Sequence, residues 1–461
     1  MAKLTALWSR LRESLWLVPS IIVAGAILLG IGMVEASTLV NGEALARWPR
    51  IFGVGPEGSR SMLSAIASSM ITVAGVTFSI TIVAVTQAST QYSPRILRNF
   101  MRDRANQAVL GTFVGIFAYC LVVLRTIREG EQAEFVPSLA VLVGVLLALV
   151  GVAVLIFFVH HIATTLQASE IVARIARDTQ KVLERMFPDP LDHAPANADP
   201  AGLREAVPRE GWHPVPAART GYIQHYTRSE LLRIAVQSDL LVRVEHPSGE
   251  FVVEGRPLAW FARHSAADEG RSPMVRKPDE VARSVAGTVL IGTNRSLEHD
   301  PAFGFRQLVD VALKALSPGI NDSTTALTCI DYLGALLIQV ANRRSPLEER
   351  DADGKLRVIM ADPKFEELLG LAVDEIRQHA RGNTAVLERL LTMLDSVNDV
   401  TRHSGRRRAV LREMELVRAT AEGTIPGGHD LARVEALARR VITAAQNSVS
   451  PRDDLRSSMG Q

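Results

Sequence analysis

The chain has 461 residues, and its 51 lysines and arginines nearly balance its 49 aspartates and glutamates, so the net charge is +2. This length accommodates two or three domains, and a near-neutral chain offers no overall charge for binding nucleic acid. The two cysteines, Cys120 and Cys329, form neither a disulfide framework nor a metal-binding motif, and they fit a reducing cytoplasm.

Four long apolar stretches occupy the first third of the chain, and we expect each to cross about 30 Å of hydrocarbon as a helix. They cover residues 15–34, 61–86, 108–124 and 136–160. The first is longer than the apolar part of a signal peptide, which favours an uncleaved span. The third and fourth contain spaced glycines of the kind that let membrane helices pack closely; these are Gly111, Gly115, Gly144 and Gly151.

The second span carries a stripe of small and hydroxyl-bearing residues along one side of the predicted helix. The stripe consists of Ser61, Ser64, Ser68, Thr72, Gly75, Ser79 and Thr86. In a membrane such a stripe can pack against another helix or line a wet path, and both interpretations stay open. No Asp, Glu, Lys, Arg or His lies deep inside any predicted span. Ion-coupled carriers usually place ionisable groups near the middle of the membrane, so this class of transporter is disfavoured.

The stretch after the second span is basic and amphipathic, and Pro94 interrupts it. It is a candidate elbow that couples the second span to the soluble part, with Gln91, Ser93 and Arg95 as its other residues; the alternative is a topology anchor in the headgroup layer. Lysines and arginines near the span ends number ten on the side of the N-terminus and five on the other. This bias predicts that both termini are cytoplasmic.

The predicted fold class is an α-helical membrane protein with four transmembrane helices, followed by an α+β cytoplasmic region that combines a small β-rich module with a helical bundle. We divide the chain into a four-span transmembrane domain (1–161), a helix with an irregular connector (162–218), a small α/β or barrel-like module (219–292), a helical domain (293–447) and a disordered tail (448–461).

Within the module, residues 221–226 predict a strand, and 285–291 could form another. Residues 241–244 and 251–253 flank Pro247-Ser248-Gly249, a composition typical of a hairpin connection. The clearest helix start follows, with Asp300 as the N-cap and Pro301 at the first helical position.

The helix that begins at Pro301 ends at a turn around residues 317–322. Its candidate structural residues are Pro318, Gly319, Asn321 and Asp322. Asp322 or Ser323 is expected to cap the next helix. A helix start can also hold an anion, but a capping carboxylate would occupy that position, so we favour a structural corner.

Three stretches resemble the bacterial membrane protein family catalogued as domain of unknown function 2254. They are QYSPR at 91–95, FGFRQLVD at 303–310 and ALSPGIND at 315–322. Arg306 and Asp310 in the second stretch are four residues apart, a spacing at which they can pair on a helix. The resemblance implies a multi-pass bacterial membrane protein with a cytoplasmic C-terminal part, and it implies no activity. We expect the protein to lie in the inner membrane.

Two functions are compatible with these features. The first is an oligomeric channel or pore in which the second spans of several subunits surround a path and the cytoplasmic region regulates opening. The second is a non-conducting membrane scaffold or sensor in which the stripe is a helix-packing seam. Motifs of hydrolases, metalloproteases and phosphate-binding loops are absent, so we expect no enzyme and no cofactor. The expected partners are the lipid bilayer and further copies of the chain, not nucleic acid, and the sequence assigns no ligand.

Overall fold

The computed structural model describes residues 16–39, 55–91, 103–128, 135–165, 167–190, 211–263, 277–344 and 348–448. The chain forms two compact units, Met1–Glu170 and Ile171–Gln461. The first unit contains long apolar helices, and the second combines small sheets with helices.

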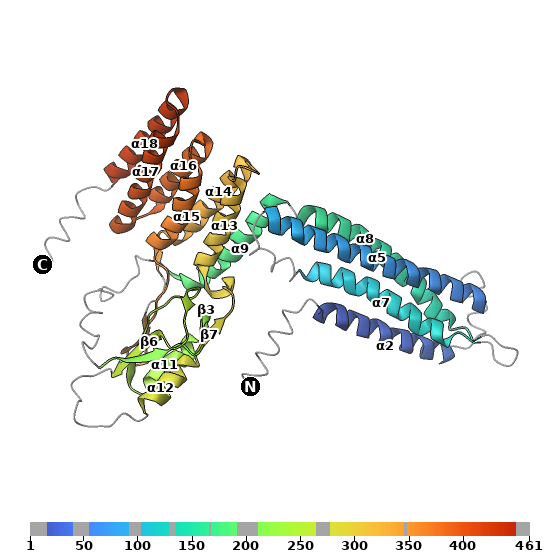
Figure 1. The fold of residues 1–461 in the computed structure, drawn as a ribbon. Helices are drawn as coiled ribbons and strands as arrows, with labels where there is room; N and C mark the ends of the chain where they lie inside the picture. Colours follow the sequence, from blue (N-terminus) through green and yellow to red (C-terminus); the bar gives the residue numbers. More distant parts are fainter. Residues whose placement is uncertain are drawn as a thin grey trace. The chain divides into compact units, whose positions relative to one another are not determined.

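The first unit is a bundle of helices that contain the four predicted spans (Figure 1). These helices are α2 (Leu17–Leu39), α5 (Pro56–Gln91), α7 (Arg104–Thr126) and α8 (Ser138–Thr165). Helix α7 contacts each of the other three, and its side chains Phe113, Tyr119 and Cys120 are fully buried. The Tyr119 hydroxyl donates a 2.8 Å hydrogen bond to the carbonyl oxygen of Ala140 in α8, which satisfies a polar group in an apolar interior.

The spaced glycines of α7 and α8 lie where neighbouring helices approach most closely. A Cβ atom on Gly111 would lie 2.9 Å from Cα of Pro19 in α2, and one on Gly115 would lie 3.3 Å from Cβ of Ala26. Gly144 and Gly151 of α8 face Leu63 and Met70 of α5 in the same way. The glycines therefore let α2 pack on α7 and α8 pack on α5.

Among the described residues, five helices are long and apolar enough to cross a membrane. Four are α2, α5, α7 and α8, and the fifth is α14 (Ser323–Val340), which we expected in the soluble region. Helix α14 lies in the second unit, where it packs against α13 (Pro301–Ala315) and α16 (Thr384–Val400).

The second unit contains two sheets that share one hydrophobic core. The first has the strand order β2-β6-β4-β10-β9 and the second β5-β3-β7. The first sheet contains β2 (His213–Pro216), β6 (Pro257–Arg263), β4 (Leu240–Val244), β10 (Leu356–Ile359) and β9 (Glu348–Arg350). The second contains β5 (Phe251–Val252), β3 (Gly221–Tyr226) and β7 (Val289–Gly292). In addition, β1 (Asp189–Pro190) and β8 (Arg343–Arg344) pair with each other, separately from both sheets.

The strand predicted at 221–226 is present as β3. The hairpin expected nearby is wrong, and the strand expected at 285–291 is confirmed only in its second half. The proposed hairpin does not form, because β4 pairs with β6 and β10 whereas β5 pairs with β3. Val285 and Ala286 end the helix α12 (Pro278–Ala286), so the strand begins only at Val289. Pro278 at the helix start and two acidic residues in the first turn explain that helix. Strand β10, from the range assigned to the helical domain, pairs parallel with β4.

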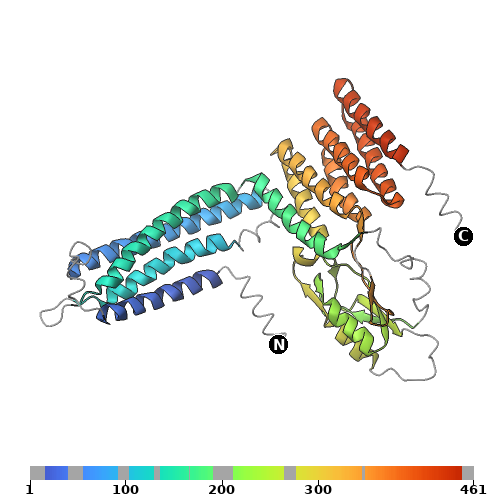
Figure 2. The same cartoon turned by 180° about the vertical axis from the view of Figure 1, so that it is seen from behind.

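Helices complete the second unit (Figure 2). They are α9 (Ala168–Met186), α11 (Arg228–Gln237), α12, the short 3-10 helix η3 (Leu297–His299), α13, α14, α15 (Phe365–His379), α16, α17 (Ser404–Thr424) and α18 (His429–Ser448). Figure 2 shows α13 to α18, drawn in yellow to red, as neighbouring helices of one array. Asp300 caps α13 and Pro301 is its first residue, which confirms the predicted start.

The exposed stripe of helix α5 as the candidate functional site

Helix α5 uses one side to pack within its bundle. Its buried residues recur at helical spacing, and they are Ser59, Leu63, Ala67, Met70, Ala74, Thr77, Ala84 and Val85. This side contacts α7 and α8. Small residues such as Ala67 and Ala74 allow the close approach, and Leu63 fills the space beside Gly144.

The stripe predicted from the sequence lies on the other side of α5. All seven of its residues are exposed: Ser61, Ser64, Ser68, Thr72, Gly75, Ser79 and Thr86. A Cβ atom on Gly75 would meet nothing within 4 Å, in contrast to the four glycines of α7 and α8. Among the described residues, the stripe therefore does not form a packing seam between helices of the bundle.

Two hydroxyls of the stripe bond to the helix backbone. Thr72 Oγ1 donates to the carbonyl oxygen of Ser68 at 2.7 Å, and Thr86 Oγ1 donates to that of Ile82 at 2.9 Å. Such bonds reduce the cost of placing a hydroxyl in hydrocarbon. The same side chains can accept a further hydrogen bond from water or from a neighbouring helix.

The interior of the bundle is apolar. Its largest buried side chains include Leu63, Phe113, Tyr119 and Phe158, which belong to α5, α7 and α8. In the described part of the chain, no group of three or more His, Cys, Asp or Glu side chains could hold a metal ion. A polar path through the centre of one bundle does not fit this packing, so the exposed side of α5 is the candidate site.

The candidate elbow lies mostly outside the described residues. Gln91 is the last residue of α5, whereas Ser93, Pro94 and Arg95 fall in the stretch that is not described. Past this stretch, Asp103 accepts a hydrogen bond from the backbone N–H of Ala105 and lies 2.9 Å from His161 of α8. Sequence reasoning missed this pair, because the two residues are 58 positions apart and no local pattern joins them.

The turn at 317–322 forms the corner between α13 and α14. Pro318, Gly319 and Asn321 are exposed, and Asn321 adopts a left-handed backbone conformation with φ of 49°. Asp322 caps α14 by accepting from the backbone N–H of Thr325 at 3.0 Å. The Thr325 hydroxyl also donates to this carboxylate and lowers the pKa of Asp322, with the backbone bond acting in the same direction.

The second family stretch joins two helices. Arg306 Nε donates to Asp310 Oδ1 at 2.8 Å, which confirms the expected pair within α13. The same guanidinium pairs with Glu375 of α15. These charges therefore fix α15 against α13.

A second pair that sequence reasoning missed consists of His225 on β3 and His299 on η3. Their rings stack with centroids 4.0 Å apart. Burial lowers the pKa of both imidazoles, and the positive charge of Arg228 lowers both further. Periodicity could not reveal this pair, because η3 is too short to carry a pattern.

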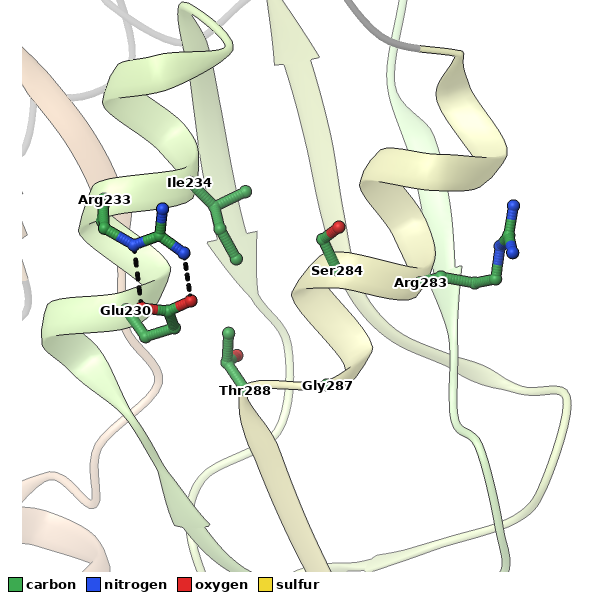
Figure 3. Close-up of a pocket in the computed structure, with 7 residues that line it drawn as sticks. All are labelled: Glu230, Arg233, Ile234, Arg283, Ser284, Gly287 and Thr288. Carbon is green, nitrogen blue, oxygen red and sulfur yellow. Dashed lines mark hydrogen bonds and ion pairs between the residues drawn. The ribbon is translucent and has the colours of Figure 1, made fainter. Parts of the chain in front are cut away.

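A hollow of about 290 Å³ lies between α11 and α12 (Figure 3). Its charged lining residues are Glu230, Arg233 and Arg283. Glu230 pairs with Arg233 within α11, and Figure 3 shows the Arg283 side chain directed away from that pair. The hollow thus presents no unpaired charge toward a ligand between its walls.

Comparisons with known proteins place this architecture in a family. The family described as "Predicted membrane protein (DUF2254)" matches residues 12–396. Uncharacterised proteins of Mycobacterium bovis and of two strains of Mycobacterium tuberculosis are 31% identical over 445 residues, which cover 96% of this chain and 82% of each relative. No solved structure matches the chain. The chain therefore belongs to the DUF2254 family of predicted membrane proteins.

Proposed function

We propose that this protein is an oligomeric channel of the inner membrane, with the exposed stripe of α5 from several copies lining a polar path. The observation that supports the proposal is that all seven stripe residues are exposed while the opposite side of α5 is packed. Hydroxyls along a path offer weak successive contacts to ions or water. One bundle has an apolar interior, so the path requires assembly of copies.

The proposed topology has four transmembrane helices, α2, α5, α7 and α8, with both termini in the cytoplasm. Helix α14 is assigned to the cytoplasmic region because Asp331, within it, pairs with Arg389 of α16 at 3.2 Å. Its apolar residues, including Cys329, Ile330 and Leu333, are buried within the second unit. A reporter enzyme active only in the periplasm, fused to the C-terminus, is expected to be inactive, and activity would contradict the topology.

The alternative function is a non-conducting scaffold or sensor in which the stripe is a seam between copies. The bonds of Thr72 and Thr86 to their own helix favour this alternative, because hydroxyls satisfied in this way need no water. Gly75 would then allow close approach of a second α5.

Single cysteines separate the two functions. Cys120 and Cys329 are first replaced by alanine, and cysteines are placed at Ser64, Ser68, Thr72 and Ser79 of the full chain in liposomes. The matched controls are Met62, Phe78 and Ile80, which are exposed apolar residues of the same helix outside the stripe. The channel predicts that a small water-soluble thiol reagent modifies the stripe positions and spares the controls.

The remaining outcomes decide against the channel. Protection of all four stripe positions, together with cross-linking between copies through them, would establish the seam. Protection without cross-linking would contradict both functions, since neither a path nor a contact between copies would then exist at the stripe.

A further inference from the structure

A second hollow, of about 590 Å³, lies in the second unit and includes part of the third family stretch. Its lining comes from the corner between α13 and α14, the connection between α15 and α16, and the start of α18. Leu316, Asn321 and Ser323 contribute from the corner. Its volume falls within the range of pockets that hold small molecules.

The charged lining of this pocket is mainly basic. Its titratable residues are His379, Arg381, Asp430 and Arg433. Arg381 is exposed and makes no hydrogen bond or ion pair with any residue that the structure describes. Arg433 pairs with Glu388, which holds its guanidinium at the pocket. The hollow beside α11 lacks such a free guanidinium.

His379 contributes a ring nitrogen to the lining. Its Nδ1 lies 2.9 Å from the carbonyl oxygen of Glu375, so Nδ1 carries the hydrogen and Nε2 stays available.

Neutral donors complete the lining. Asn383 Nδ2 donates to Ser323 Oγ at 2.8 Å, which joins the starts of α14 and α16 and leaves the Ser323 hydroxyl hydrogen free to point at a ligand. Asn321 and Thr384 supply a further amide and a further hydroxyl. The lining contains no Phe, Tyr or Trp side chain.

We propose that this pocket binds a small phosphate monoester that also carries hydroxyl groups, such as a sugar phosphate. Arg381 and Arg433 bind the phosphate group, since guanidinium groups form paired, charge-assisted hydrogen bonds to phosphate. Nε2 of His379 accepts a hydrogen bond from a ligand hydroxyl. Asp430 accepts a hydrogen bond from a ligand hydroxyl. Phosphate alone occupies a small part of 590 Å³, and the hydroxyl-bearing part fills more of the remainder. The site is independent of conduction through the membrane.

The test uses the full chain in nanodiscs of zwitterionic phosphatidylcholine, with ribose 5-phosphate and inorganic phosphate as probes in calorimetric titrations at constant ionic strength. Arg381→Ala is expected to weaken both probes about tenfold, the loss of one charge-assisted contact. Asp430→Asn is expected to tighten inorganic phosphate, because it removes a repelling charge, and to weaken ribose 5-phosphate relative to it.

Arg408→Ala is the matched control. Arg408 is also exposed and without a partner among the described residues, but it lies 16 residues before Thr424, about 24 Å along α17 from the end near Gly382. Unchanged affinity in this variant is expected. Equal weakening in Arg408→Ala and Arg381→Ala, or no saturable binding of either probe, would overturn the proposal. Thermal unfolding of each variant shows that the fold is retained.

A lipid headgroup could supply the same phosphate chemistry, and a second arm distinguishes this source. The titration is repeated in nanodiscs that contain anionic phosphatidylglycerol. A soluble ligand predicts the same affinity for ribose 5-phosphate in both membranes. Competition seen only with phosphatidylglycerol, and abolished by Arg381→Ala, would assign the pocket to a headgroup and reject the soluble ligand.

Discussion

Oδ2 of Asp103 lies 2.9 Å from Nε2 of His161, and this contact joins the start of α7 to the final turns of α8. The side chains are 10% and 20% exposed, so solvent screens the contact only partly. The His161 ring also stacks on Phe157, with centroids 5.5 Å apart. Since Oδ1 of Asp103 caps α7, one carboxylate sets both the start of a helix and its contact with the next.

Replacing Asp103 separates these two roles. Asp103→Ala removes the cap and the contact with His161, and we expect a loss of about 2 kcal/mol in the free energy of unfolding. Asp103→Asn keeps an oxygen for the cap and is expected to lose less than half as much. Thermal unfolding in detergent measures both variants. Equal losses would show that the cap contributes nothing.

The glycines of the bundle allow a direct test of helix packing. Gly111→Ala places a methyl group 2.9 Å from the backbone of Pro19, which cannot move aside as a side chain can, and we expect a loss of about 1–3 kcal/mol. Gly75→Ala is the control, because its new methyl group meets nothing within 4 Å. Unfolding of the detergent-solubilised monomer compares them, and a similar loss in both variants would contradict the packing described for α2 and α7.

The corner before α14 is sensitive to its cap. Asp322→Ala removes two acceptors for Thr325 and is expected to cost about 1 kcal/mol. Asn321→Gly is expected to be tolerated because glycine adopts positive φ without strain, whereas Asn321→Val is expected to destabilise the corner. Chemical denaturation of the full chain ranks the three variants. Asn321→Val with wild-type stability would contradict the left-handed conformation.

The stacked histidines predict a dependence of stability on pH. Burial lowers the pKa of His225 and His299 in the folded protein, so the unfolded chain takes up protons first as the pH falls. Their contribution to the free energy of unfolding is fully present above about pH 6.5. It is lost as the pH falls from there through the pKa values of the two histidines in the folded protein.

The double variant His225→Gln with His299→Gln tests this dependence. We expect its melting temperature to change less between pH 7.5 and pH 5.5 than that of the wild-type chain. The matched control is His403→Gln, at an exposed histidine. A parallel decrease in the wild-type chain and the double variant would assign the acid sensitivity to other groups.

The sequence predicts the long apolar helices of the first unit and the capped start of α13 well, because both depend on local patterns. Apolar runs locate α2, α5, α7 and α8, and the Asp300-Pro301 pair locates the start of α13. The hairpin prediction failed because β4 pairs with β6, the strand that follows β5, while β5 pairs with β3. Local composition carries no information about that choice.

The stripe of α5 was visible in the sequence, but its environment was not. Ala67 and Ala74 on the packed side are as small as Ser64 and Ser68 on the exposed side, so residue size does not distinguish the two. The positions of α7 and α8 determine which side of α5 is packed and which is exposed. The basic pocket was also hidden, because its residues come from three separate connections.

The parallel pairing of β10 with β4 constrains how the second unit can be made. Val358 and Val242 are register partners, although α12, α13 and α14 lie between them in sequence. After β4 has left the ribosome, more than a hundred further residues must be synthesised before β10 exists. Closing such a long loop is slow. Until then one edge of β4 is open to foreign strands. A fragment that ends at residue 292 would keep this edge permanently unpaired, so the sheet and its helices have to be expressed as one piece.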